Sequence, residues 1–152
     1  MNAMLSFYVS VHARPTNATA GATIALSGRP VQALALQPAE LATTAFPCSF
    51  ETAQERLSKL ERMFCEADGS FVWTSPQSAL TWQVDGNLYD RDGRLLFVDL
   101  KGSCPSDQFD RLLAALGWPE AKLVFQLTRE AVFLDEAEFR RHAAAAHREK
   151  PF

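Results

Sequence analysis

The stretch TWQVDGNLYDRDGRLLFVDLKG, residues 81–102, has the pattern of two β-strands joined by a turn. Its central Arg-Asp-Gly segment suits a three-residue hairpin loop in which Gly93 takes the left-handed conformation. Counting outward from that loop places Asp85 directly opposite Asp99. The hairpin therefore decides which side chains lie opposite one another in the sheet.

Each strand of this hairpin is expected to have one apolar and one polar face, because side chains alternate across a strand. The polar face gathers Asp85, Asp99 and Lys101 at one end. Two carboxylates directly across a sheet have Cβ atoms about 5 Å apart and repel each other. A divalent cation such as Mg²⁺ would offset that repulsion, and Lys101 would then stabilise charge developing on a phosphate. The apolar face predicted to enter the core consists of Trp82, Val84, Leu88, Leu96, Val98 and Leu100.

The composition is that of a soluble globular protein, with 152 residues, 47% of them hydrophobic and 22% charged. This length fits one domain. A net charge of −3 gives no overall attraction to nucleic acid or to an anionic membrane, and no apolar run approaches the ~18 residues of a membrane span. The odd number and wide separation of Cys48, Cys65 and Cys104 indicate free thiols and predict a cytoplasmic location.

Periodicity along the rest of the chain predicts an α/β domain of the α+β type, with a single mixed, mostly antiparallel sheet and helices packed on it. Residues 1–47 are expected to contribute strands that form an appendage to the main sheet, and residues 48–152 to form the core domain. The expected core order is αβββαβ, followed by a short strand and a C-terminal helix, with helices over 50–67 and 106–116 and a strand over 123–127. The predicted core comprises Leu57, Leu60, Phe64, Trp82, Val84, Leu88, Val98, Leu100, Leu112, Leu113, Leu116, Val124 and Phe125.

The hairpin residues also resemble a known family. Asp85 in one strand, followed by Asp99-Leu-Lys101 on the next, is similar to the motif of the PD-(D/E)XK nuclease superfamily, and the surrounding text is similar to its Holliday-junction-resolvase-like branch. The order helix, three strands, helix, strand over residues 50–128 is also that family's core. The resemblance implies a metal-dependent phosphodiesterase acting on nucleic acid, with Asp85 and Asp99 binding Mg²⁺ or Mn²⁺ and Lys101 as the catalytic amine. Glu55 in the first helix is a candidate for an assisting acid.

Other interpretations stay open at this point. Asp85, Asp99 and Lys101 also suit an ordinary solvated face, on which Lys101 neutralises a neighbouring carboxylate. Asp85-Gly86 is itself a turn signal, and a turn there would place Asp85 at a loop tip. The element order also resembles the small secretion-chaperone-like fold, which implies a non-catalytic protein-binding module with an exposed apolar surface and a dimer. The sequence leaves the partner and the oligomeric state undecided.

Overall fold

The hairpin at residues 81–102 lies in the middle of a seven-stranded sheet in the computed structural model, which describes residues 3–76 and 81–149. The strand order is β4-β5-β6-β7-β1-β8-β9, and every neighbouring pair is antiparallel. This arrangement confirms the predicted α+β class with a mostly antiparallel sheet. The elements are β1 (Met4–Ala13), β2 (Thr19–Leu26), β3 (Arg29–Ala35), α1 (Pro38–Thr43), α2 (Phe50–Ser58), β4 (Met63–Cys65), β5 (Ser70–Thr74), β6 (Gln83–Arg91), β7 (Arg94–Pro105), α3 (Ser106–Ala115), β8 (Leu123–Leu127), β9 (Val132–Leu134) and α4 (Glu136–Glu149).

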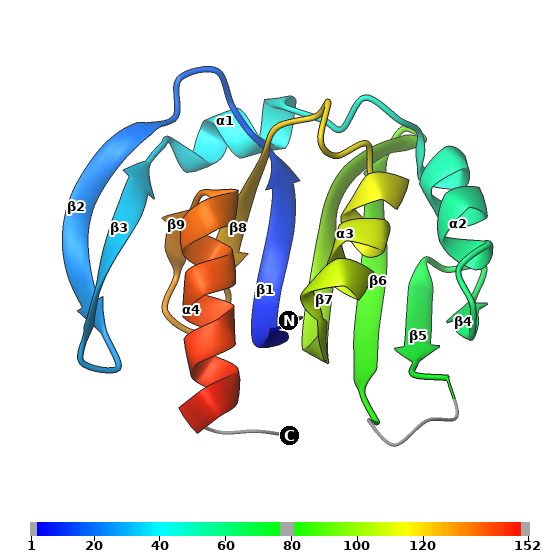
Figure 1. The fold of residues 1–152 in the computed structure, drawn as a ribbon. Coiled ribbons are helices and arrows are strands. Elements are labelled where there is room, and N and C mark those ends of the chain that lie inside the picture. The colour runs from blue at the N-terminus through cyan, green and yellow to red at the C-terminus, as the bar shows by residue number, and fades with distance from the viewer. Residues whose placement is uncertain (1–2, 77–80, 150–152) are drawn as a thin grey trace.

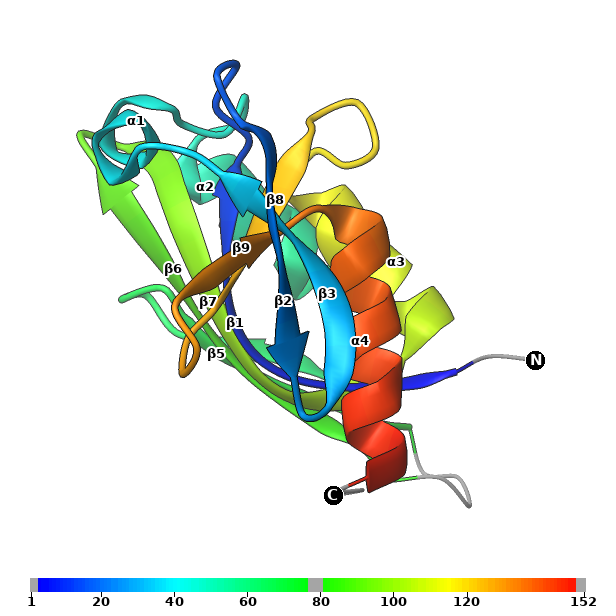
Figure 2. The same cartoon turned by 90° about the vertical axis from the view of Figure 1, so that its left-hand side faces the viewer.

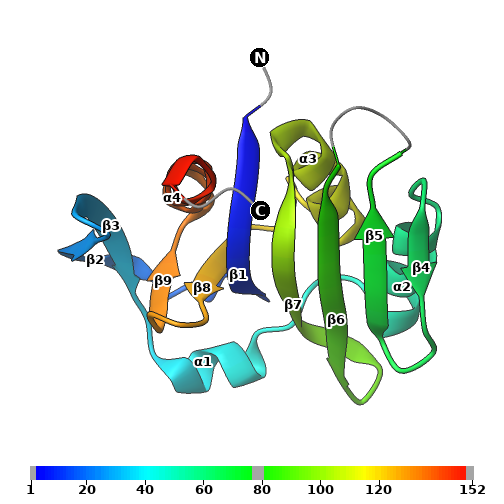
Figure 3. The same ribbon diagram turned by 90° about the horizontal axis from the view of Figure 1, so that it is seen from below.

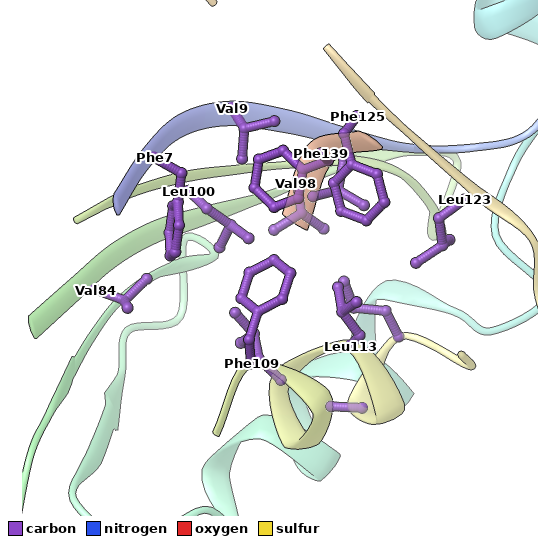
Figure 4. Packing of buried hydrophobic residues seen from close by; sticks show 14 of the residues in the cluster. Phe7, Val9, Val84, Val98, Leu100, Phe109, Leu113, Leu123, Phe125 and Phe139 are labelled. Atoms are coloured by element: carbon purple, nitrogen blue, oxygen red, sulfur yellow. The ribbon is translucent and has the colours of Figure 1, made fainter. Parts of the chain in front are cut away.

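The core lies between the large sheet and its helices (Figure 1). Figure 4 shows Phe109 of α3 directed toward the sheet, where its ring centroid lies 5.2 Å from that of Phe7. Phe139 of α4 joins the same cluster and stacks on Phe125 at 4.5 Å. Eleven of the predicted core residues are buried, namely Leu57, Trp82, Val84, Leu88, Val98, Leu100, Leu112, Leu113, Leu116, Val124 and Phe125, while Leu60 is partly buried.

Helix α2 is shorter than the helix predicted over 50–67. It ends at Ser58, and β4 occupies part of the predicted range. Arg62 takes the left-handed conformation, with φ of 59°, and the chain reverses. Phe64 then pairs with Val72 of β5 and is 57% exposed, so its predicted place in the core is wrong. Strand pairing overrides the helical spacing because it gives the backbone of this segment its hydrogen-bond partners.

Strand β1 occupies the centre of the large sheet, between β7 and β8. Its Leu5, Phe7, Val9 and Val11 are all buried. We expected residues 1–47 to form an appendage, but only β2 and β3 form a separate two-stranded sheet. Strand β3 of that sheet contacts β9 and α4 (Figure 2). Alternation of apolar and polar residues favours a strand at β1, but it does not reveal which strands lie beside it.

The hairpin turn contains two residues, not three. Asp92 and Gly93 both have positive φ, 54° and 82°, as the two central residues of a tight type I′ turn require. The register shifts next to this turn, because Tyr89 pairs with Phe97 whereas Asp90 pairs with Leu95. Between those two pairs, β7 contains one extra residue, which forms a bulge.

The bulge changes which side chains of β7 enter the core. Leu95 is fully buried, whereas Leu96, the extra residue, is half-buried, so the predicted assignment of Leu96 to the core face is wrong. Beyond the bulge, Lys101 pairs with Asp85. The predicted opposition of Asp85 and Asp99 is therefore wrong by two residues.

Candidate binding face

Within residues 3–76 and 81–149, no helix covers one side of the large sheet along most of its width. Figure 3 shows α3 and α4 on one side of the sheet, and α1 on the other side at one end only. At that end, Arg91 Nη1 donates a hydrogen bond of 3.2 Å to the carbonyl oxygen of Ala42 in α1. We call the outward side of β4, β5, β6, β7 and β1 the open face. Its β1 end adjoins the C-terminal part of α4, where Ser6 Oγ lies 2.8 Å from His147 Nδ1.

A row of five cross-strand neighbours crosses the open face. Phe64 pairs with Val72, Val72 with Asp85, Asp85 with Lys101 and Lys101 with Tyr8. This central row therefore contains two apolar side chains, an acid, an amine and an aromatic ring. It forms because each of these strands presents alternate residues to the same side.

All three residues predicted for a catalytic site lie on the open face, but in a different arrangement. Asp85 accepts a hydrogen bond of 2.9 Å from the side-chain amide of Gln83. Asp99 lies diagonally across from Asp85 and accepts a hydrogen bond of 2.5 Å from the Ser10 hydroxyl. Residues in this diagonal relation have Cα atoms about 7–8 Å apart, so the repulsion expected of directly opposed carboxylates is reduced.

Lys101 makes no ion pair with any residue in the described ranges. Its Nζ instead lies 5.2 Å from the centroid of the Tyr8 ring, and the Arg129 guanidinium carbon lies 5.8 Å from the same centroid. A cation over an exposed aromatic ring is attracted by about 0.5–1 kcal/mol. The amine is therefore held loosely against Tyr8 and can still meet an acid brought by another molecule.

The donors near Asp85 and Asp99 do not fit a resident Mg²⁺ or Mn²⁺. Residues 3–76 and 81–149 contain no group of three or more His, Cys, Asp or Glu side chains placed to hold a metal ion. Glu55, the candidate assisting acid, lies on α2 and forms an exposed ion pair of 3.7 Å with Lys59. The buried residues of α2 belong to the core on the other side of the sheet, so Glu55 does not join the open face.

The open face carries the exposed large apolar side chains of the residues that the structure describes. In the part of the chain that the structure describes, the exposed large hydrophobic residues are Tyr8 at 40%, Phe64 at 57%, Val72 at 38% and Tyr89 at 38%. All four belong to this face. Alternation along the strands accounts for the place of Tyr89, which is four residues from Asp85 on β6, and of Tyr8, which lies between the buried Phe7 and Val9 on β1. Phe64 was missed because its helical spacing was misleading.

An aromatic cluster extends across the end of the face near α1. Tyr89 stacks on Phe97 with ring centroids 4.4 Å apart, and Phe97 stacks on His12 at 5.4 Å. Burial lowers the pKa of His12, although its hydrogen bond to Gln126 and the nearby Asp99 carboxylate oppose that effect. Burial therefore favours the neutral imidazole of His12, which belongs to a largely aromatic part of the face.

A cavity of about 630 Å³ adjoins the opposite end of the face. Its lining includes Asp85 and Lys101 of the central row, together with Arg29 and His142. Arg29 forms an ion pair with Glu149 at this wall. Burial is the main cause that lowers the pKa of His142, so it favours the neutral form of this imidazole as well.

Comparison of the chain with protein-family models, with curated proteins and with solved structures gives no match. The helices within residues 3–76 and 81–149 are all too short or too polar to span a bilayer. Inference about the function therefore depends on the open face and its side chains.

Proposed function

We propose that this protein is a non-catalytic interaction module that binds protein through its open face. The observation that carries the proposal is that Tyr8, Phe64, Val72 and Tyr89, the exposed large apolar side chains of the described residues, all lie on one uncovered sheet surface. Scattered exposed apolar side chains are normal on soluble proteins, but their concentration on one face is typical of an interaction site.

The chemistry of the face suits binding by contact. Exposed aromatic side chains bury large areas with little loss of side-chain freedom, and they dominate the energy of many interfaces. Asp85 and Lys101 sit between the apolar residues of the central row, where charges fix the orientation of a partner more than they add affinity. The donor set offers less support to the metal-dependent nuclease hypothesis, because two diagonal carboxylates without a third ligand do not make a closed metal site.

Peptides selected from a random display library for binding to the folded wild-type protein test this proposal. We expect selected peptides to converge on the open face and to lose about tenfold or more in affinity when Phe64 is changed to Ser. Lys59→Ser is the matched control, since Lys59 is an exposed side chain outside the open face. Peptides that bind Phe64→Ser and Tyr8→Ser variants as tightly as wild type would overturn the proposal.

A further inference from the structure

The geometry points to a second copy of this chain as the partner, bound face to face through β6 and β7, an inference that rests on the proposed function. These two strands lie at the middle of the open face, and each row places a complementary pair across them. Asp85 lies opposite Lys101 in the central row, and Tyr89 lies opposite Phe97 in the aromatic cluster. Between those rows, Asn87 lies opposite Asp99, an amide beside an acid.

A two-fold axis parallel to the strands, running between β6 and β7, turns these pairs into contacts between copies. The operation sets each β6 residue over the β7 residue of the same row in the other copy. Asp85 then meets Lys101 of the second copy, and Lys101 meets Asp85 of the second copy. Tyr89 meets Phe97 of the second copy in the same way. An interface of this symmetry forms each of these contacts twice.

The strands that flank the hairpin are complementary under the same operation. Strand β5 of one copy lies over β1 of the other, so Val72 meets Tyr8 of the second copy. These two side chains are 38% and 40% exposed in the single chain. Apolar residues therefore lie on both sides of the central ion pairs and exclude water from them, an arrangement that favours interface contacts.

Other two-fold axes in the plane of the sheet give poorer contacts. An axis perpendicular to the strands through the row of Asn87 and Asp99 sets Asp99 on Asp99 of the second copy. A similar axis through the central row sets Asp85 on Asp85 of the second copy. An axis midway between those rows sets Lys101 over Asp99 of the second copy, but it also sets the aromatic Tyr89 against the polar Gln83. Like charges in direct opposition disfavour the first two axes and the mismatched aromatic ring disfavours the third, so the axis parallel to the strands is favoured.

The size of the face predicts a weak dimer. Five strands spaced about 4.8 Å apart, over about 20 Å of strand length, give at most roughly 400 Å² of surface per copy. Twice that area is below the about 1,200–2,000 Å² that stable interfaces bury. The cavity lined by Asp85 and Lys101 reduces the part of this surface that can be in contact. The twist of stacked sheets, about 30°, further concentrates the contact on β6 and β7. We therefore expect weak, reversible self-association.

Analytical ultracentrifugation of the full chain over about 1–1,000 µM tests the inference. Wild type should dimerise reversibly. Lys101→Glu and Asp85→Lys should each weaken self-association at least tenfold, because each places two like-charge pairs in the interface. Lys59→Glu, which makes the same change of charge as Lys101→Glu but at the C-cap of α2, should have no effect. Thermal unfolding followed by circular dichroism checks that each variant is folded.

Mixing the two single variants separates contacts between copies from those within one chain. Under the proposed symmetry, an Asp85→Lys chain and a Lys101→Glu chain offer each other two opposite-charge pairs, so the mixture should form a heterodimer although neither variant self-associates. A wild type that is monomeric throughout the range overturns self-association and leaves the peptide-binding test of the open face unaffected. A dimer that responds equally to Lys101→Glu and Lys59→Glu, or a mixture that stays monomeric, overturns this geometry.

Discussion

Truncation of two adjacent leucines tests the register on which the site depends. Leu95 is fully buried, whereas Leu96 is the half-buried residue of the bulge. Leu95→Ala removes three buried carbons, worth about 0.8 kcal/mol each, and leaves a cavity that adds about 1 kcal/mol or more. We expect Leu95→Ala to lower the free energy of unfolding by about 3–4 kcal/mol, and Leu96→Ala by about 1 kcal/mol.

Urea denaturation of both variants gives the two values under one set of conditions. The intrinsic cost of placing Ala in a strand is similar at the two positions, so the difference between the variants reports burial. If Leu96→Ala costs as much as Leu95→Ala or more, then the hairpin has a three-residue loop. Asp85 would in that case lie opposite Asp99, and the pairing of Asp85 with Lys101 would be wrong.

Three further predictions concern packing, pH and metal. Gly86→Ala should destabilise the fold by about 1–3 kcal/mol in the same urea assay, because the added Cβ would overlap the Phe71 ring, and Phe71→Leu should relieve part of that cost. Burial lowers the pKa of His12, so the unfolded chain takes up its proton first as the pH falls. The contribution of His12 to stability is therefore complete well above pH ~6.5 and declines below it, and His12→Gln should reduce the slope of melting temperature between about pH 7 and 5. Millimolar Mn²⁺ should leave the melting temperature unchanged, and the protein should not cut nucleic acid; a rise abolished by Asp99→Asn would instead support the nuclease hypothesis.

Local chemistry explains why much of the fold was predictable. Ser49 is of a residue type that favours helix N-caps, and its Oγ accepts the Thr52 backbone N–H at 3.0 Å. Asp135, of another such type, precedes the last helix and accepts the Glu138 N–H at 2.8 Å. Strand 123–127 and helix 106–116 followed from apolar runs and spacing. These signals depend on residues a few positions apart, so a single sequence is enough to read them.

Strand pairing explains two of the predictions that were wrong, the helix that was extended to Phe64 and the peripheral place of β1. The apolar spacing of Leu57, Leu60 and Phe64 continues a helical stripe, but the pairing of Phe64 with Val72 favours a strand. The central position of β1 depends on β7 and β8, which are distant in the sequence. Neither outcome has a local signal, because both depend on which segments meet after the chain collapses.

The length of the hairpin loop also decides which residue lies opposite Asp85, and therefore which function the face favours. With a three-residue loop, Asp85 opposes Asp99, and two directly opposed carboxylates require a cation or another group to offset their repulsion. With the observed turn and bulge, Asp85 opposes Lys101, and the reason to expect a metal is removed. The same shift brings an acid and an amine into one row between Val72 and Tyr8. A two-fold axis places the Asp85 carboxylate of each copy on the Lys101 amine of the other. This charge pattern favours contact with another copy of the same face over chemistry on a substrate.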